Sequence, residues 1–124
     1  MRRFTFLAAI LLAFQFLAPA GHAQQTAQMT WQFKSLHANI VDVKLFAKAR
    51  GNQWPTTTTV WSLKDSEPHT VRITCQVNEQ ICYGAWVRGS NSAYWGVGKD
   101  GSAGCTNCCY RCVDGEVPLR TLNP

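Results

Sequence analysis

Alternation of apolar and polar positions is clearest in two segments. In residues 70–77 every second side chain is apolar, and residues 40–47 alternate in the same way. A period of two places the apolar side chains on one face of a strand and the polar ones on the other. Both segments are therefore predicted to be half-buried strands. The apolar face of the first is Val71, Ile73, Cys75 and Val77.

Weaker patterns predict further short strands, and turn-forming residues separate them. No segment after residue 23 shows a sustained helical period. Several short strands with frequent turns are typical of an antiparallel β-sandwich, with a small β-barrel as the alternative. We expect a sandwich whose C-terminal segment is irregular. The further segments are 29–33, 56–63, 81–87, 93–97 and a tail with Val117, Leu119 and Thr121 on one face.

Residues 81–87 are predicted to form a hairpin with residues 70–77. A symmetric turn at Asn78 and Glu79 sets Cys75 opposite Cys82. Opposed strand positions lie at a distance that a disulfide can bridge, so we expect a Cys75–Cys82 bond. A register shifted by one residue gives the alternative, in which Cys82 points toward the C-terminal cysteines. The core would then receive Ile81, Tyr83, Ala85 and Val87.

The first residues have the composition of a signal peptide. Arg2 and Arg3 precede an apolar run over residues 4–17, and Gly21 and Ala23 fit the small-x-small cleavage rule. We expect cleavage after Ala23, which makes 1–23 a signal peptide and 24–124 a single secreted or periplasmic β domain. The apolar run is shorter than the ~20 residues of a membrane span, so no span is expected after cleavage.

The charge distribution does not favour nucleic acid as a partner. The formal net charge is +5, and loss of Arg2 and Arg3 with the signal peptide lowers it to +3. The remaining lysines and arginines are scattered singly, without a run that would follow a phosphate backbone.

All six cysteines lie in the predicted domain. An even number in a small exported chain is typical of a disulfide framework. A four-thiolate metal site and a redox-active C-x-x-C pair are alternatives for the last four. Eight residues have little freedom to surround one ion, and no helix start is evident there, so we predict structural disulfides without metal or cofactor. The cysteines are Cys75, Cys82, Cys105, Cys108, Cys109 and Cys112.

Three further patterns carry little evidence of catalysis. Residues 96–101 match G-x-G-x-x-G, but the sequence that follows is not helical, so a turn is expected rather than a dinucleotide site. His37 and His69 lie in unrelated polar segments, and no carboxylate pair favours glycoside hydrolysis. We predict no catalytic residues and do not expect an enzyme.

The aromatic residues give the best indication of binding. Five tryptophans are many for this domain, and we expect two or three to be buried and at least one exposed. Exposed aromatic rings stack on sugars and anchor protein interfaces. Tyr94 and Trp95 are adjacent, so one of them must point away from the core. With Trp86 and Arg88, which share a face of the preceding strand, they are the candidate binding residues.

Three functions are consistent with these features. The first is a binding module for a glycan or for an envelope or host protein. The second is a small secreted inhibitor or effector that presents a rigid disulfide loop. The third is a metal-binding or thiol-redox protein that uses the cysteine cluster. We favour them in that order.

Overall fold

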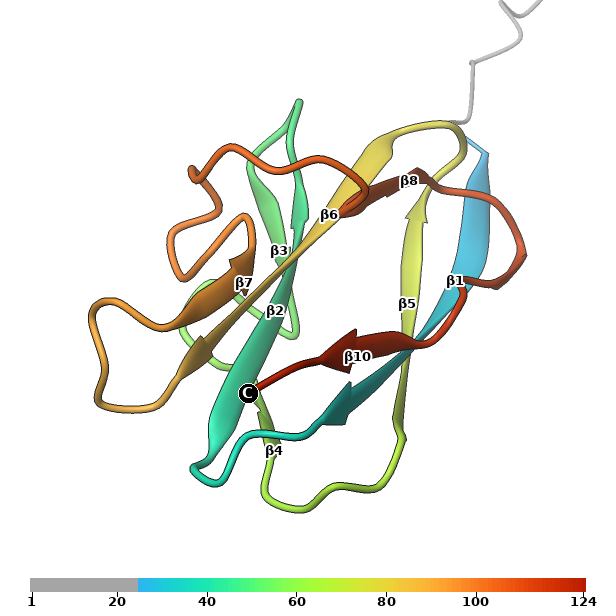
Figure 1. Cartoon of the computed structure of the whole chain (residues 1–124). Helices are drawn as coiled ribbons and strands as arrows, with labels where there is room; N and C mark the ends of the chain where they lie inside the picture. Colours follow the sequence, from blue (N-terminus) through green and yellow to red (C-terminus); the bar gives the residue numbers. More distant parts are fainter. Residues whose placement is uncertain (1–24) are drawn as a thin grey trace, which may run out of the picture.

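The computed structural model describes residues 25–124, which form ten β-strands and include no helix. The predicted signal peptide and its cleavage site lie outside the described residues. The strands build two sheets that face each other (Figure 1). Over residues 25–124 there is thus no helix long and apolar enough to cross a membrane.

The first sheet is built around its longest strand. This strand, β1 (Thr26–Ser35), pairs antiparallel along its length with β5 (His69–Gln76). On its other side β1 pairs in parallel with β9 (Gly115–Glu116) and β10 (Arg120–Leu122). The C-terminal end of the chain therefore completes the sheet that the N-terminal strand begins (Figure 1).

The second sheet is built on the antiparallel pair β2 (Val41–Ala47) and β6 (Gln80–Val87). Short strands extend both members of the pair: β3 and β4 lie along β2, and β7 and β8 lie along β6. Their bounds are Asn52–Trp54 for β3, Trp61–Leu63 for β4, Tyr94–Gly96 for β7 and Cys109–Arg111 for β8.

The core lies between the inner faces of the sheets. Trp31 of β1 is completely buried, its ring stacks on that of Phe33 at 5.8 Å, and the edge of Tyr110 approaches it at 5.4 Å. From the second sheet, β2 supplies Val43 and Leu45, both completely buried. No strand pairing joins the two sheets within residues 25–124, so the fold is the predicted sandwich and not a closed barrel.

The predicted hairpin is wrong. β5 pairs with β1 in the first sheet and β6 with β2 in the second, so the turn between them is a corner from one sheet to the other. Asn78 sits in this turn with a positive φ of 69°. Cys75 therefore does not face Cys82, and the expected Cys75–Cys82 bond does not form.

The alternative side-chain orientation of β6 is the one observed. Ile81, Ala85 and Val87 are buried in the main core, whereas Cys82 lies on the opposite face. Cys75 bonds to Cys112 and Cys82 bonds to Cys109, its register partner on β8. Cys105 bonds to Cys108. All six cysteines are thus paired, as a disulfide framework predicts, and such a framework indicates an oxidising environment.

Two of the predicted strands are shorter or more broken than expected. In 56–63 only the last three residues are a strand, because the Thr56 hydroxyl accepts hydrogen bonds from the backbone of Thr58 and Thr59 and forms a local turn. In the tail, Val117 is buried but Leu119 is 43% exposed. Pro118, which lacks an N–H donor, separates β9 from β10, so these positions do not share one face.

The expectation for the tryptophans is correct only in part. Trp31 and Trp86 are buried, in agreement with two or three core residues. The remaining three, Trp54, Trp61 and Trp95, are half-buried against the main core, so the expected fully exposed tryptophan is not present.

Candidate functional site

The outer face of the second sheet carries the candidate site. Because alternate side chains of a strand point to opposite faces, β2 sends Asp42, Lys44 and Phe46 outward while its apolar residues enter the core. On β6 the matching outward positions include Gly84 and Trp86. This outer face is not fully open to solvent, since the chain after β7 folds back over part of it.

The covering segment, residues 97–108, packs on a second small apolar cluster. Val97 and Cys108 are buried there against Phe46 and Cys82. The Lys48 ammonium group donates a hydrogen bond of 2.8 Å to the carbonyl of Gly101. The Cys82–Cys109 disulfide fixes the far end of this segment to β6.

The G-x-G-x-x-G stretch forms the predicted turn. Its three glycines, Gly96, Gly98 and Gly101, all have positive φ, a conformation that glycine adopts without steric cost. No helix follows them within residues 25–124, so the context that would confirm a dinucleotide site is not observed.

Trp86 and Tyr94, two of the four predicted site residues, lie side by side. They are register partners on β6 and β7 and both line a pocket of about 280 Å³. Tyr94 is 54% exposed, whereas Trp86 is 6% exposed and contributes to the wall. The pocket is completed by Ser90, Asn91, Ala93, Val97, Gly98, Lys99, Asp100, Ser102 and Ala103.

Trp95 points the other way, as the alternation along a strand requires. It packs partly against the main core, and its indole Nε1 donates a hydrogen bond of 3.1 Å to the carbonyl of Asn123. Its ring meets that of His37 edge-on at 6.0 Å. The structure thus separates Trp95 from Tyr94 and Trp86.

A second pocket, of about 320 Å³, adjoins the first. Trp86, Lys99 and Asp100 line both pockets, and we call the pair the outer cleft. The second pocket is otherwise lined by Lys44, Gln53, Thr57, Thr58 and Val60. Hydroxyl, amide and charged groups therefore surround one aromatic wall.

Lys44 is an unusual residue in this cleft because it is only 6% exposed. Its Nζ donates to Gln53 Oε1 at 2.5 Å and to the carbonyl oxygen of Thr57 at 3.0 Å. It also lies 6.0 Å from the centre of the Phe46 ring. Burial lowers the pKa of Lys44 from its ordinary value, since removal from water disfavours the charged form.

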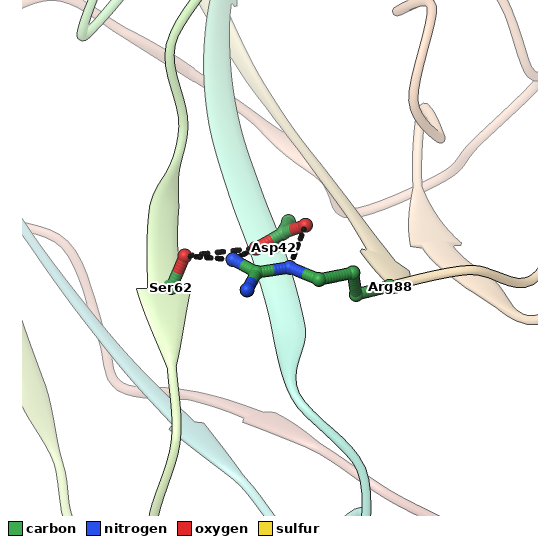
Figure 2. A network of polar contacts seen from close by, with 3 residues as sticks. All are labelled: Asp42, Ser62 and Arg88. Carbon is green, nitrogen blue, oxygen red and sulfur yellow. Dashed lines mark hydrogen bonds and ion pairs between the residues drawn. The ribbon is translucent and has the colours of Figure 1, made fainter.

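Arg88 belongs to a polar network on the same outer face (Figure 2). Its guanidinium donates to both carboxylate oxygens of Asp42, at 2.8 and 3.1 Å, and to Ser62 Oγ at 2.6 Å. The Ser62 hydroxyl in turn donates to Asp42 at 2.9 Å. Hydrogen bonding to Asp42 raises the pKa of Arg88. The network connects β2, β4 and the end of β6.

Two of the four predicted binding residues, Trp86 and Tyr94, line the outer cleft, and the other lining residues were not predicted. Arg88 shares the outer face, but two of its guanidinium nitrogens are engaged in hydrogen bonds to Asp42 and Ser62, and Trp95 lies on the opposite face. The missed residues include Lys44, Gln53 and Asp100. The alternation in β2 already places Lys44 outward, but its burial requires later segments, among them β3 and the turn at Thr57, to lie against it.

Hydroxyl, amide, charged and aromatic side chains line the outer cleft. His69, the first residue of β5, lies 2.7 Å from Asp65 of the preceding loop, and neither His37 nor His69 lines the outer cleft. Among residues 25–124 no three His, Cys, Asp or Glu side chains are grouped as metal ligands would be. No family model, curated protein or solved structure matches this chain.

Proposed function

We propose that this protein is a secreted or periplasmic binding module that holds a glycan in the outer cleft. The observation that carries the proposal is the pairing of Trp86 with Tyr94 in a cleft whose other walls are mainly polar. Sugars present apolar C–H faces that stack on aromatic rings and hydroxyls that hydrogen-bond to polar side chains. A glycan therefore matches both parts of this lining.

A glycan fits the cleft better than a folded envelope or host protein does. A stable protein interface needs a broad contact surface, about 800 Å² on each partner. Among residues 25–124, in contrast, five large apolar side chains are exposed, and only Tyr94 lines the outer cleft: Leu36, Val77, Tyr94, Val113 and Leu119. A glycan that binds inside the outer cleft needs no such broad contact surface.

One observation supports the inhibitor or effector alternative. Between Cys105 and Cys108 the chain is exposed, and the disulfide closes this short loop at the edge of the covering segment. A rigid exposed loop of this kind is suited to entering a partner's cleft. The metal alternative needs free thiolates as ligands, whereas every cysteine sulfur is bonded to another. The thiol-redox alternative rests on Cys105–Cys108, a C-x-x-C pair in its oxidised form, but no helix start is present there to lower a thiol pKa.

The proposed compartment follows from the disulfides and the N-terminal sequence together. Disulfide-rich small domains occur where thiols are oxidised, as outside the cell or in a periplasm. The charged start and apolar run of residues 1–17 are the export signal that would deliver the chain there.

Binding of the oxidised domain to an array of neutral and acidic glycans tests the proposal. Tyr94→Ala should weaken binding by about tenfold or more, because loss of a central aromatic contact costs upward of 1 kcal/mol. Val113→Ala is the control, since Val113 is similarly exposed, at 52%, but does not line the outer cleft. Absence of binding to every glycan, or equal loss in both variants, would refute a glycan site in the cleft.

A further inference from the structure

The positive charge of Lys44 has no carboxylate partner in the described part of the chain. Among residues 25–124 the ion pairs join Arg50 to Glu79, His69 to Asp65 and Arg88 to Asp42. Lys44 instead contacts two neutral acceptors, an amide oxygen and a backbone carbonyl. An ammonium group has three N–H donors, so one remains for another acceptor.

A purely structural role does not account for a charged residue at this position. The two hydrogen bonds of Lys44 connect β2 to Gln53 of β3 and to the turn at Thr57. Removing a charge from water without an ion-pair partner disfavours the charged form, and neutral acceptors recover only part of the lost hydration. An uncharged side chain of similar length would fill the space without that cost.

The charges around the outer cleft favour a negatively charged ligand. Besides Lys44, the cleft is lined by Lys99 and Asp100, both exposed, which leaves an excess of one positive charge. The other carboxylate of this face, on Asp42, is neutralised by the guanidinium of Arg88. The net charge of the cleft is thus positive, and its most buried charge is the ammonium of Lys44.

We infer that the outer cleft selects an acidic glycan, whose carboxylate or sulfate group accepts a hydrogen bond from the Lys44 ammonium. This inference rests on the proposed glycan-binding function and names the class of glycan. The anion supplies the ion-pair partner that Lys44 lacks within residues 25–124, in a site partly shielded from water, where charge-assisted hydrogen bonds are strong. The aromatic wall of Trp86 holds the sugar ring beside it.

The test compares matched ligands and matched variants. Oligogalacturonate is titrated against the same oligosaccharide with its carboxyl groups reduced, and a sulfated galactan is titrated against its desulfated form. Lys44→Met keeps the length of the side chain without its charge. The control is Lys64→Met, which removes an equal charge from an exposed site outside the cleft.

Wild-type protein should prefer one of the acidic ligands over its neutral partner. Lys44→Met should reduce that preference by at least about tenfold, the value of one hydrogen bond to a charged group, while Lys64→Met preserves it. Which acidic ligand is preferred identifies carboxylate or sulfate as the bound group. Equal binding of acidic and neutral ligands would overturn the inference but leave the glycan-binding function intact.

A second variant keeps the test valid if Lys44→Met does not fold. Asp100→Asn removes a negative charge from an exposed cleft residue and should strengthen acidic-ligand binding severalfold without affecting the neutral ligand. Glu67→Gln, an exposed position outside the cleft, is its control. If Asp100→Asn and Glu67→Gln strengthen acidic-ligand binding equally, the ligand is attracted only by the net charge of the protein. That result would overturn the inference. Failure of every glycan to bind would refute the proposed function itself.

Discussion

At Gly84 the covering segment comes too close to β6 for any side chain. A Cβ atom there would overlap the carbonyl oxygen of Gly98 and would also press on the ring of Phe46. Gly84→Ala should therefore destabilise the domain by about 1–3 kcal/mol, the usual cost of overpacking. Denaturant unfolding measures this. Gly104→Ala is the control, because nothing lies within 4 Å of the added atom, and an equal loss in both variants would contradict the prediction.

Tyr83 makes the stability of the domain sensitive to alkaline pH. Burial raises the pKa of Tyr83 above its ordinary value of 10.0, although the charge of Arg120 acts in the opposite direction. The unfolded chain then loses the phenol proton at a lower pH than the folded chain does. The stabilising contribution is complete below pH 10 and is lost as the pH rises through the folded pKa.

The measurement is denaturant unfolding as a function of pH, with Tyr83→Phe as the comparison. Stability of the wild-type protein should fall more steeply above pH 10 than that of the variant, which has no proton to lose at this position. Parallel curves would show that Tyr83 ionises equally in both states.

Single residues could be predicted where local alternation decides the outcome. The opposite orientation of Tyr94 and Trp95 follows from the period of a strand, and the structure confirms it. The burial of Lys44 could not be predicted, because it depends on tertiary placement of the segments that contact it, such as Gln53 of β3 and the turn at Thr57. The sequence pattern alone marks Lys44 as a solvent-exposed polar position.

At the level of strands, the alternation located the elements but not their partners. The segments 40–47 and 70–77 correspond closely to β2 and β5. The hairpin prediction failed because a short turn is equally compatible with two paired strands and with a corner between sheets. Only the whole set of apolar faces decides this, since β5 pairs better with the long strand β1 than with β6.

The three disulfides connect elements over very different chain lengths, and their contributions to stability should differ accordingly. Cys75–Cys112 closes a sequence separation of 37 residues, whereas Cys105–Cys108 closes one of 3. Because a longer closed loop restricts the unfolded chain more, replacing the first pair by alanine should cost about 4 kcal/mol and the second about 2.

Thermal or denaturant unfolding of the two double variants measures this difference. Peptide mapping of the unreduced protein checks the pairing itself. A peptide that links Cys75 to Cys82 would contradict the separation of β5 and β6 into two sheets.

At the scale of the whole molecule, composition and alternation were enough for the fold class. Many short strands without a helical period predicted a sandwich, and residues 25–124 form one. The parallel pairing of β9 and β10 with β1 was not predictable, because it joins the two ends of the domain through strands of only two and three residues.

Removal of the signal peptide is predicted for the whole molecule, and the cleavage site lies outside the described residues. Cleavage after Ala23 should give a mature protein that begins at Gln24. N-terminal sequencing or the intact mass of exported protein measures this. Retention of Met1, or cleavage several residues away, would contradict it.

The covering segment is attached to a single strand at both of its ends. Pairing of β7 holds one end to β6, and the Cys82–Cys109 disulfide holds the other end to the same strand. These two attachments hold the covering segment to the strand beneath it, so the proposed glycan would need little ordering of the outer cleft when it binds. Reduction of this one bond would leave the far end held to β6 only by the backbone pairing of β8 and by the hydrogen bond from the Tyr83 N–H to the carbonyl of Cys108, so the covering segment would be displaced more easily from the outer face of β6.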